Sequence, residues 1–517
     1  MSEIKILWAD DEIDLLKPHI NFLNGKGYEV ITATNGTDAI QLCKEERFDL
    51  IFLDENMPGL TGLETLSDIK SMEPNLPVIM ITKSEEEQIM DDAIGSKITD
   101  YLIKPVNPNQ ILLTIKKVVD DKRLRNEKTT LDYQQEFRSI SLSFNEKMDY
   151  EEWITLYKKL VFWELELQNL PEPDLNSILM SQKEEANTVF FKFIESNYQN
   201  WLRYSEENKP LLSPNLFREK VFPLINEEEP VFFILIDNLR FDQWKVIQPI
   251  VSQYFRVEKE DLYFSILPTT TQYSRNSIFS GLLPSEIQKT YPELWQDESS
   301  DEGKNLNEEK FLVDQLKRNG FDIKHSYTKI TKLDKARSLI DKIPNLVNND
   351  LNVIIYNFVD MLSHARTDME IIKELASNEA AYRSITLSWL EHSPLLEALK
   401  RISEYNVKLI ITTDHGSIRV SSPSKVIGDR NTTSNLRYKH GKQLQYDPKD
   451  VLSITNPKNS YLPQKHINSS YIFAKEDKFF VYPNNYNHFV KFYNDTFQHG
   501  GISLEEMLIP VINLTNK

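Results

Sequence analysis

The chain has 517 residues, 40% of them hydrophobic, and a formal net charge of −18 at pH 7. This length predicts two or three globular domains and the composition excludes disordered and fibrous classes, while the acidic excess argues against binding of duplex DNA. Cys43 is the only cysteine, so an internal disulfide is excluded. The sequence shows neither a signal-peptide core nor an apolar run of membrane length, so we expect a cytoplasmic protein with no membrane partner.

Strand-like and helix-like segments alternate over the first 120 residues. The strand-like segments are residues 4–9, 28–33, 48–54, 77–82 and 100–105, and the helix-like segments are 14–27, 36–46, 63–72, 84–95 and 109–119. Five βα units in succession predict a parallel sheet covered by helices.

Polar residues fall at the ends of these predicted strands. Asp10 and Asp11 follow the first strand, Asp54 ends the third, and Lys104 ends the fifth. The ends of parallel strands share one sheet edge, so we expect the three carboxylates to form an oxygen-rich site suited to Mg²⁺, with Lys104 beside it.

This segment resembles the receiver domain of two-component response regulators, with a CheY-like (βα)5 fold. The similarity rests on the Asp10–Asp11 pair, the DENMPGLTG loop, a hydroxyl at the end of the fourth strand and the Lys104–Pro105 dipeptide. It implies the following roles: Asp54 as phosphoryl acceptor, Asp10, Asp11, Asp54 and the Asn56 carbonyl as Mg²⁺ ligands, Lys104 as phosphoryl contact, and Thr82 with Tyr101 as switch pair. Lys104–Pro105 is a candidate cis peptide, because X–Pro bonds adopt cis at modest cost.

Residues 121–220 carry apolar residues at three- and four-residue spacing, as in EEWITLYKKLVFWELELQNL. This spacing predicts a helical bundle, and the helix that ends the receiver is expected to continue into it as a connector. Trp153, Trp163 and Trp201 lie on the predicted helices, where we expect them to pack in the core. We expect this segment to couple the two ends of the chain mechanically.

Residues 221–517 return to α/β alternation, and apolar runs lead directly into chemically reactive residues. Predicted strands at 231–237, 262–268, 353–358 and 408–413 resemble strands buried on both faces of a sheet. The residues at or after the strand ends are Asp237, Thr271, Asp360, His364, Asp414 and His415, and His499 follows in FQHGG. In an open α/β sheet these residues would converge at the carboxyl edge. Asp360 and His364 share one helix face if a helix follows the third strand.

These segments resemble the alkaline phosphatase superfamily, specifically its PglZ branch, and LPTTTQYSRNSIFSG resembles the nucleophile loop of nucleotide pyrophosphatase/phosphodiesterases. The resemblance implies one ion site formed by Asp360, His364 and His499. It implies a second formed by Asp237, Thr271, Asp414 and His415. Thr271 is the implied nucleophile, although Thr269 and Thr270 are adjacent alternatives.

Mixed imidazole and carboxylate ligands suit two Zn²⁺ ions, and Mn²⁺ fits the same ligand types. Two such ions can activate a hydroxyl and hold a phosphoryl group, which predicts a metal-dependent phosphodiesterase acting on small nucleotides or oligonucleotides. Arg275 and Lys439 are candidate substrate contacts, with surface cations as the alternative, and His440 is a candidate substrate or outer contact.

The sequence therefore predicts a multidomain α/β protein: a receiver over residues 1–120, a helical linker over 121–220, and an alkaline phosphatase-like domain over 221–517. The whole arrangement resembles response regulators linked to type IX secretion. That resemblance implies a sensor histidine kinase, a sigma factor or secretion component as output partner, and a homodimer on phosphorylation. The alternative is a docking module, without enzymatic activity, whose metal site is structural.

Overall fold

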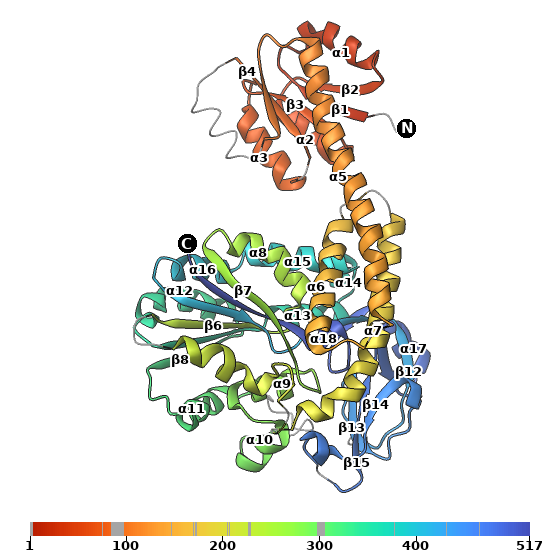
Figure 1. Cartoon of the computed structure of the whole chain (residues 1–517). Coiled ribbons are helices and arrows are strands. Elements are labelled where there is room, and N and C mark those ends of the chain that lie inside the picture. The colour runs from red at the N-terminus through yellow and green to blue at the C-terminus, as the bar shows by residue number, and fades with distance from the viewer. Residues whose placement is uncertain are drawn as a thin grey trace. The chain divides into compact units, whose positions relative to one another are not determined.

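The computed structural model describes residues 4–517 apart from 75, 84–97, 146, 169, 171–172, 204, 206, 226–228, 297–304, 377, 431 and 465 (Figure 1). The helix predicted over residues 84–95 lies outside the described residues. The chain forms two compact units, Met1–Glu136 and Phe137–Lys517. None of the described helices is both long and apolar enough to cross a membrane.

The first unit is built on one parallel sheet with the strand order β2-β1-β3-β4-β5. The strands are β1 (Ile4–Ala9), β2 (Tyr28–Ala33), β3 (Leu50–Asp54), β4 (Val78–Thr82) and β5 (Asp100–Ile103). The helices described in this unit are α1 (Lys17–Asn24), α2 (Gly36–Glu45), α3 (Gly62–Met72) and the start of α5 (Pro108–Ser143).

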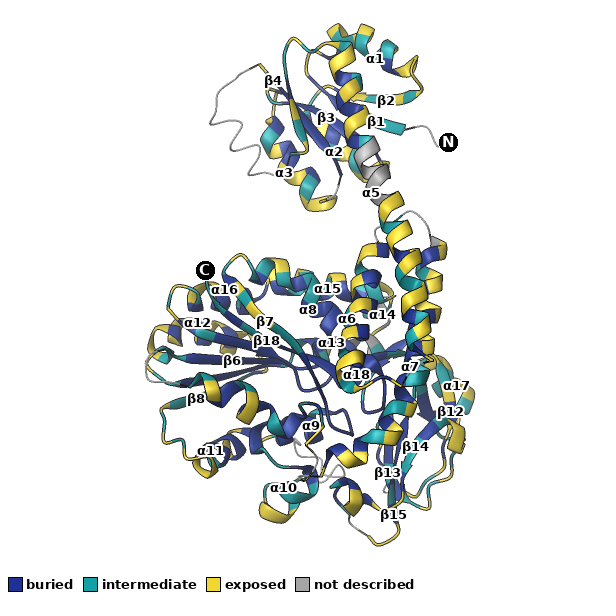
Figure 2. Cartoon of the chain, viewed as in Figure 1, coloured by how far each residue is buried: buried dark blue, intermediate teal, exposed yellow. Residues whose placement is uncertain are grey.

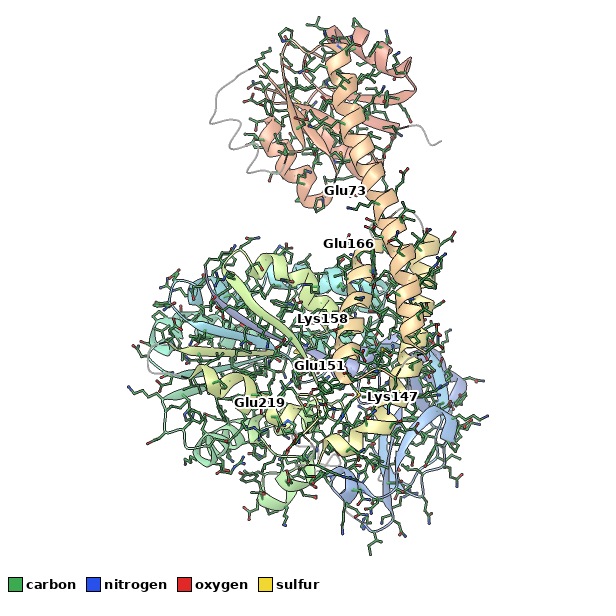
Figure 3. The ribbon with its side chains drawn as sticks, in the orientation of Figure 1. Glu73, Lys147, Glu151, Lys158, Glu166 and Glu219 are labelled. Atoms are coloured by element: carbon green, nitrogen blue, oxygen red, sulfur yellow. The ribbon has the colours of Figure 1, made fainter. Side chains whose placement is uncertain are left out.

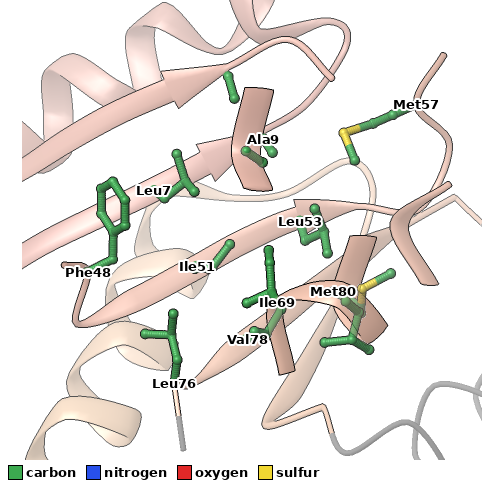
Figure 4. Packing of buried hydrophobic residues seen from close by; sticks show 13 residues of the cluster. Leu7, Ala9, Phe48, Ile51, Leu53, Met57, Ile69, Leu76, Val78 and Met80 are labelled. Atoms are coloured by element: carbon green, nitrogen blue, oxygen red, sulfur yellow. The ribbon is translucent and has the colours of Figure 1, made fainter. Parts of the chain in front are cut away.

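Alternating residues of these strands fill two cores, one on each face of the sheet. Leu7 and Ile51 belong to one cluster, which Figure 4 shows, whereas Trp8 and Phe52 belong to the other. Because successive side chains of a strand point to opposite faces, both faces need helical cover, and the apolar runs of the sequence have this double burial. The peptide between Lys104 and Pro105 is cis, as predicted.

Helix α5 continues from the first unit into the second, which confirms the predicted connector helix. Helices α6 (Tyr150–Leu167) and α7 (Pro173–Trp201) follow, and Asp149 caps α6 by accepting hydrogen bonds from the backbone N–H groups of Glu151 and Glu152. Trp153, Trp163 and Trp201 are buried, as predicted.

The helical linker and the C-terminal domain form one unit in the structure, whereas the sequence-based division places a boundary near residue 220. The contacts that join them include Lys158 of α6, labelled in Figure 3, whose ammonium donates to the Glu260 carbonyl at 2.6 Å. The two compact units meet within α5, after Glu136.

The second unit contains a six-stranded sheet with the order β7-β18-β10-β6-β9-β8. Strands β8 (His325–Ile330), β9 (Leu351–Tyr356), β6 (Val231–Ile236) and β10 (Lys408–Thr412) are parallel, and β18 (Leu508–Asn516) is antiparallel to β10 and to β7 (Phe255–Phe264). Every residue of β6 and β9 is buried, as their apolar sequences predict, and Figure 2 shows the buried interior of this sheet.

The strand predicted over residues 262–268 is shifted in the structure. Strand β7 ends at Phe264, and the Ser265 N–H donates to the Met507 carbonyl at 2.8 Å, so residues 265–270 form the loop that enters α9 (Thr271–Ser280). Strand β8 was not predicted, because its sequence HSYTKI is largely polar and only half-buried.

The remaining helices and strands surround the large sheet. The helices are α8 (Phe241–Val251), α10 (Pro284–Thr290), α11 (Glu308–Arg318), α12 (Leu333–Leu346), α13 (Phe358–Asp368), α14 (Glu370–Leu375), α15 (Glu379–Glu391), α16 (Pro394–Ile402), α17 (Tyr486–Tyr493) and α18 (Leu504–Met507). The small sheets pair β11 (Ile418–Val420) with β17 (Thr496–Gln498), β12 (Ser422–Lys425) with β16 (Lys478–Val481), and β15 (Ser469–Ala474) with both β13 (Tyr438–Lys442) and β14 (Val451–Ile454).

Candidate functional site

The predicted reactive residues of the second unit gather at the carboxyl edge of the large sheet. Asp237 follows β6, Asp414 and His415 follow β10, and Asp360 lies on α13 just after β9. These three strands are adjacent and parallel, so the residues after them reach one edge of the sheet.

Asp237, Asp414 and His415 form one fully buried group, whose ligand-type atoms lie within 4.8 Å of one another. His415 Nε2 is 3.7 Å from Asp237 Oδ1 and 3.8 Å from Asp414 Oδ2. His415 Nδ1 lies 3.1 Å from the Gly416 carbonyl, which accepts a hydrogen bond from it and leaves Nε2 free to act as a ligand.

Arg275 of α9 lies between the carboxylates of this group and is itself fully buried. Its guanidinium forms an ion pair with Asp237 Oδ2, donates to Asp414 Oδ2 at 3.0 Å, and approaches Glu308 Oε1 at 3.5 Å. The predicted substrate contact or surface cation at Arg275 is therefore corrected to an internal cation that orients two carboxylates.

The two carboxylates have opposite pKa shifts. Burial raises the pKa of Asp237 well above its usual value, although the Arg275 charge opposes this effect. Burial would also raise the pKa of Asp414, but the charges of Arg275 and His415 outweigh it and lower that pKa to about 2. A low pKa keeps Asp414 ionised, and Asp237 depends on nearby positive charge to remain so.

Asp360, His364 and His499 form a second group with ligand-type atoms within 4.8 Å. Asp360 Oδ2 is 3.5 Å from His364 Nε2, and its Oδ1 is 3.6 Å from His499 Nε2. Asp360 Oδ1 is buried and has no hydrogen-bond partner among the described residues. A buried carboxylate oxygen without a hydrogen-bond partner is unfavourable, and carboxylate and imidazole groups together are ligands for a divalent cation. The group therefore suits a site that binds such a cation.

His499 connects the two groups. Its ring stacks on His415 with centroids 4.2 Å apart, and the Thr269 carbonyl, 3.2 Å away, accepts a hydrogen bond from its Nδ1. Burial, followed by the neighbouring His415 and His364, lowers the pKa of His499 well below its usual value. The imidazole is therefore neutral near pH 7, which is the form that binds metal ions.

Thr271 is the first residue of α9, and its hydroxyl faces the first group. Its Oγ1 is 3.0 Å from His415 Nε2 and 3.4 Å from Asp237 Oδ1. Thr269 differs, because its Oγ1 donates to the Gly501 carbonyl and accepts from the Gly500 N–H, each at 3.0 Å. Thr270 precedes the helix as its N-cap. The geometry favours Thr271 as the reactive hydroxyl.

A cavity of about 440 Å³ opens beside Thr271, His364 and His499. The other residues that line it are mostly neutral and polar: Thr270, Gln272, Asn305, Thr367, Thr433, Ser434, Asn435, Leu436, Tyr438, Tyr493 and Gln498. Single-sequence patterns did not reveal these residues, because they come from separate loops without a motif.

Asn435 is held in a defined orientation at this cavity. Its side-chain oxygen accepts hydrogen bonds from the backbone N–H groups of Arg437 at 2.7 Å and Tyr438 at 3.1 Å. Its amide NH₂ group therefore remains the donor that can face a ligand.

Lys439 and His440, predicted as substrate contacts, are not among the described residues that line the cavity. Lys439 is buried, donates to the Thr433 carbonyl at 2.9 Å and lies over the Tyr482 ring. His440 stacks on Tyr471 with centroids 4.2 Å apart. Because β13 carries both residues into the small sheet, this prediction is corrected to structural packing.

The first unit brings Asp10, Asp11 and Asp54 together, with ligand-type oxygens within 4.8 Å. Lys104 Nζ is 2.9 Å from Asp10 Oδ2 and 2.9 Å from Asp54 Oδ1. Burial raises the pKa of Asp54, and the hydrogen bond from Lys104 opposes it. Burial also disfavours the charged lysine, but its bonds to Asp54 and Asp10 outweigh this and raise its pKa.

The other predicted receiver residues lie near this group. Asn56 is exposed in the loop after β3. Thr82 ends β4, and its hydroxyl donates to Glu55, the residue after Asp54. Tyr101 is 39% exposed on the neighbouring strand β5. The two predicted switch residues thus lie on adjacent strands, with Thr82 linked to the acceptor loop.

Three family models match the chain in order. Residues 6–116 match the response regulator receiver domain, residues 123–202 the PorX response regulator linker domain, and residues 216–514 the BREX system PglZ alkaline phosphatase-like domain. The last match covers more than half of the chain, so the protein belongs to the PglZ alkaline phosphatase-like family. The three domains in this order give it a PorX-like architecture, with a CheY-like receiver at the N-terminus.

Similar curated proteins match the receiver segment. The transcriptional regulatory protein ZraR of Klebsiella oxytoca is 34% identical over 129 residues, which are 25% of this chain and 29% of that protein. The CpxR homolog of Haemophilus influenzae is 36% identical over 117 residues, or 22% of this chain and 50% of that protein. The chain thus spans at most half the length of these relatives.

Among solved structures, the chemotaxis protein CheY4 of Vibrio cholerae is 32% identical, with a TM-score of 0.22, and covers 23% of this chain and 99% of its own. The family matches establish a two-component regulator with a phosphatase-like output domain. Receiver domains use Mg²⁺ and a phosphodonor such as a histidine kinase, and alkaline phosphatase-like folds depend on metal ions.

Proposed function

We propose that the output domain is a phosphodiesterase that acts on small nucleotide or oligonucleotide substrates with Thr271 as its nucleophile. The observation that carries this proposal is the position of the Thr271 hydroxyl, 3.0 Å from His415 Nε2 at the mouth of a cavity of about 440 Å³. The proposed ligands are Asp237, Asp414 and His415 with Thr271 for one ion, and Asp360, His364 and His499 for the other. Zn²⁺ is the proposed metal, and Mn²⁺ fits the same donors.

Two bound divalent ions would lower the pKa of the Thr271 hydroxyl and neutralise negative charge on the phosphoryl group. Thr271 Oγ1 would lose its proton to water and form a bond to phosphorus, while the bond from phosphorus to the leaving oxygen breaks and that oxygen takes up a proton from water to become the alcohol. Water completes the reaction by hydrolysing the phosphothreonine, which returns Thr271 to its starting state. The N-terminus of α9, where Thr271 lies, favours the negative charge of the phosphoryl group.

The cavity lining supports a diester as the substrate. No lysine or arginine occurs among the described residues that line it, so no basic side chain there pairs with the second charge of a phosphomonoester. The amide groups of Asn435, Gln272 and Gln498 suit neutral hydrogen-bonding groups such as those of a nucleoside.

In the first unit, we propose that Asp54 accepts the phosphoryl group from a sensor histidine kinase, with Asp10, Asp11, Asp54 and the Asn56 carbonyl holding Mg²⁺. Lys104 then contacts the phosphoryl group, and Thr82 with Tyr101 forms the switch pair. The ion pairs from Lys104 to Asp10 and Asp54 support these assignments. Type IX secretion is the proposed process, with a sigma factor or secretion component as output partner, because the linker matches the PorX model.

The test measures hydrolysis of bis-p-nitrophenyl phosphate and p-nitrophenyl phosphate by zinc-loaded protein. We expect the diester to be preferred and Thr271→Ala to lower its kcat at least about a thousandfold, since the nucleophile is lost. Thr271→Ser keeps a hydroxyl and should retain measurable activity. Thr270→Ala tests the adjacent alternative nucleophile, because it removes the neighbouring hydroxyl and leaves the Thr271 hydroxyl in place.

Full activity of Thr271→Ala would remove Thr271 as the nucleophile. If the wild-type protein binds metal but hydrolyses neither ester, the phosphodiesterase proposal is wrong. The alternative, a docking module whose metal site is structural, then takes its place.

A further inference from the structure

A buried charge network lies beside the metal-type groups of the second unit. It consists of four acids and three bases: Glu164, Asp242, Glu379, Glu505, Lys183, Arg240 and Arg383. Glu164, Asp242 and Glu379 also bring carboxylate oxygens within 4.8 Å of one another. A metal ion is not required there, because lysine and arginine already neutralise these carboxylates.

Arg240 is the member of the charge network nearest to the candidate ligands in sequence, three residues after Asp237. Its guanidinium pairs with Asp242 at 2.6 Å and with Glu379 at 2.5 Å. It also donates to the Ser417 carbonyl, and Ser417 lies three residues after Asp414. One fully buried side chain thus connects the loop after β6 with the loop after β10.

Arg240 also contacts the segment that leads to His499. Its guanidinium lies 5.1 Å from the Phe497 ring centroid and 5.4 Å from that of Tyr382, and these two rings stack on each other. Phe497 precedes His499 by two residues. Arg240 therefore contacts or belongs to three of the segments that carry candidate metal ligands.

The charge network continues into the linker helices. Arg383 of α15 donates to Asp242 at 3.1 Å and to Glu164 of α6 at 2.5 Å. Lys183 of α7 pairs with Glu164 at 2.6 Å and approaches Glu505, just before β18, at 3.4 Å. Gly416, directly after His415, packs against this segment, and its N–H donates to the Glu506 carbonyl at 3.2 Å.

We infer that Arg240 is a positioning residue, which fixes the spacing of the loops that carry Asp237, Asp414 and His415, and which Arg383 connects to linker helix α6. This inference rests on the proposed function, because it assigns the geometry of the same ion site. A displacement of α6 changes the ion pairs of Arg383 with Glu164 and Asp242. Because Asp242 also pairs with Arg240, this displacement changes the position of Arg240. The affinity of the ion site therefore depends on the linker.

The test titrates the metal-free full-length protein with Zn²⁺ against a competing chelator, in excess Mg²⁺. We expect Arg240→Lys to weaken one Zn²⁺ site about 10- to 100-fold, the usual range for residues that support metal ligands. Lysine keeps the charge but lacks the planar guanidinium that pairs with two carboxylates and a carbonyl in fixed directions. The kcat for the diester should fall at limiting Zn²⁺ and recover at higher Zn²⁺, which a merely unfolded variant would not do.

The matched control is Arg401→Lys, an exposed arginine of α16 that pairs with Glu404 and lies outside the charge network. It should bind Zn²⁺ as the wild type does. Glu379→Gln is the milder second variant if Arg240→Lys does not fold, and Arg383→Lys tests the connection to α6. Each should weaken the same site by a smaller factor.

Unchanged Zn²⁺ affinity in folded Arg240→Lys and Glu379→Gln would overturn the inference. If the wild-type protein binds two ions but hydrolyses no diester, the proposed function fails. The Zn²⁺ affinities of the variants still decide the role of Arg240 in that case.

Discussion

Arg275 places a positive charge among three carboxylates in the interior, those of Asp237, Asp414 and Glu308. Its second effect is geometric, because each aspartate directs one oxygen to the guanidinium. For Asp237 this leaves Oδ1 facing Thr271 and His415. A metal ligand whose second oxygen is hydrogen-bonded has a fixed orientation. Arg275 thus explains how two adjacent aspartates remain directed at one point.

Glu164 allows a test of the charge network through the pH dependence of stability. Burial raises the pKa of this carboxyl, but the charges of Lys183 and Arg383 outweigh it, so the folded-state pKa is below the usual value. A group with a lowered pKa stabilises the fold above its unfolded pKa, near 4.3, and that stabilisation is lost as the pH falls through the folded pKa.

We therefore expect Glu164→Gln to lower the free energy of unfolding by about 3 kcal/mol at pH 7, since two buried cations each lose one of their charged partners. The difference from wild type should be complete above about pH 5 and shrink below about pH 4. Urea unfolding followed by tryptophan fluorescence measures it. Glu166→Gln, an exposed position on the same helix, is the control and should change stability by less than about 0.5 kcal/mol. If the difference in the free energy of unfolding between Glu164→Gln and wild type grew as the pH falls, the ion pairs assigned to Glu164 would be contradicted.

At the scale of single elements, the loop after β10 is packed directly on the segment before β18. A Cβ atom on Gly416 would lie 2.0 Å from the Glu505 carbonyl oxygen, which is backbone and cannot rotate away. Glycine is therefore required at this close approach, and the neighbouring His415 depends on it for its position.

Gly416→Ala should separate these two segments and displace His415. A misplacement of about 1 Å at a catalytic group costs about a hundredfold in rate, so we expect kcat for the diester to fall by that factor while the far-UV circular dichroism stays unchanged. Gly320→Ala is the control for the substitution itself: nothing lies within 4 Å of its added Cβ, and only its φ of 81° is strained. Equal activities of the two variants would show that the packing at Gly416 does not position His415.

At the scale of the whole molecule, the parts of the fold predicted from sequence are those determined by local patterns. Buried strands such as β6 and β9 have continuous apolar runs, and the receiver strands end at carboxylates that the structure brings together. The burial of Arg275 and Lys439 could not be predicted, because burial of a cation depends on partners distant in sequence, such as Asp414 for Arg275. The cavity residues were missed for the same reason.

The linker segment is helical, as predicted, and its buried polar residues lie against the C-terminal domain. Glu164 and Lys183 look like solvated helix positions in the sequence, and both are buried against the C-terminal domain. Burial of charges is expected only where they are paired, and their partners Arg383 and Glu505 lie more than 200 residues away. Helical periodicity therefore predicts the helices and leaves their packing partners open.

The receiver assignment can be tested on the intact protein with acetyl phosphate and Mg²⁺. We expect the wild type to take up one phosphoryl group on Asp54 and to form a homodimer, because a new charge of about −2 beside Lys104 changes the electrostatics around Thr82 and β5. Asp54→Ala should do neither. Phosphoprotein gel shifts and sedimentation velocity measure the two effects.

Asp14→Ala is the matched control, because Asp14 is an exposed aspartate of the same unit that pairs only with Lys17 among its ion pairs in the described residues. Uptake by Asp54→Ala equal to that of wild type would contradict the acceptor assignment. If the wild type takes up the phosphoryl group but does not dimerise, Asp54 remains the assigned acceptor, and a homodimer is excluded as the result of its phosphorylation. Diester hydrolysis measured on the same samples then shows whether phosphorylation of Asp54 changes the rate of the reaction at Thr271. A hydrolysis rate unchanged by phosphorylation would exclude control of hydrolysis by the receiver.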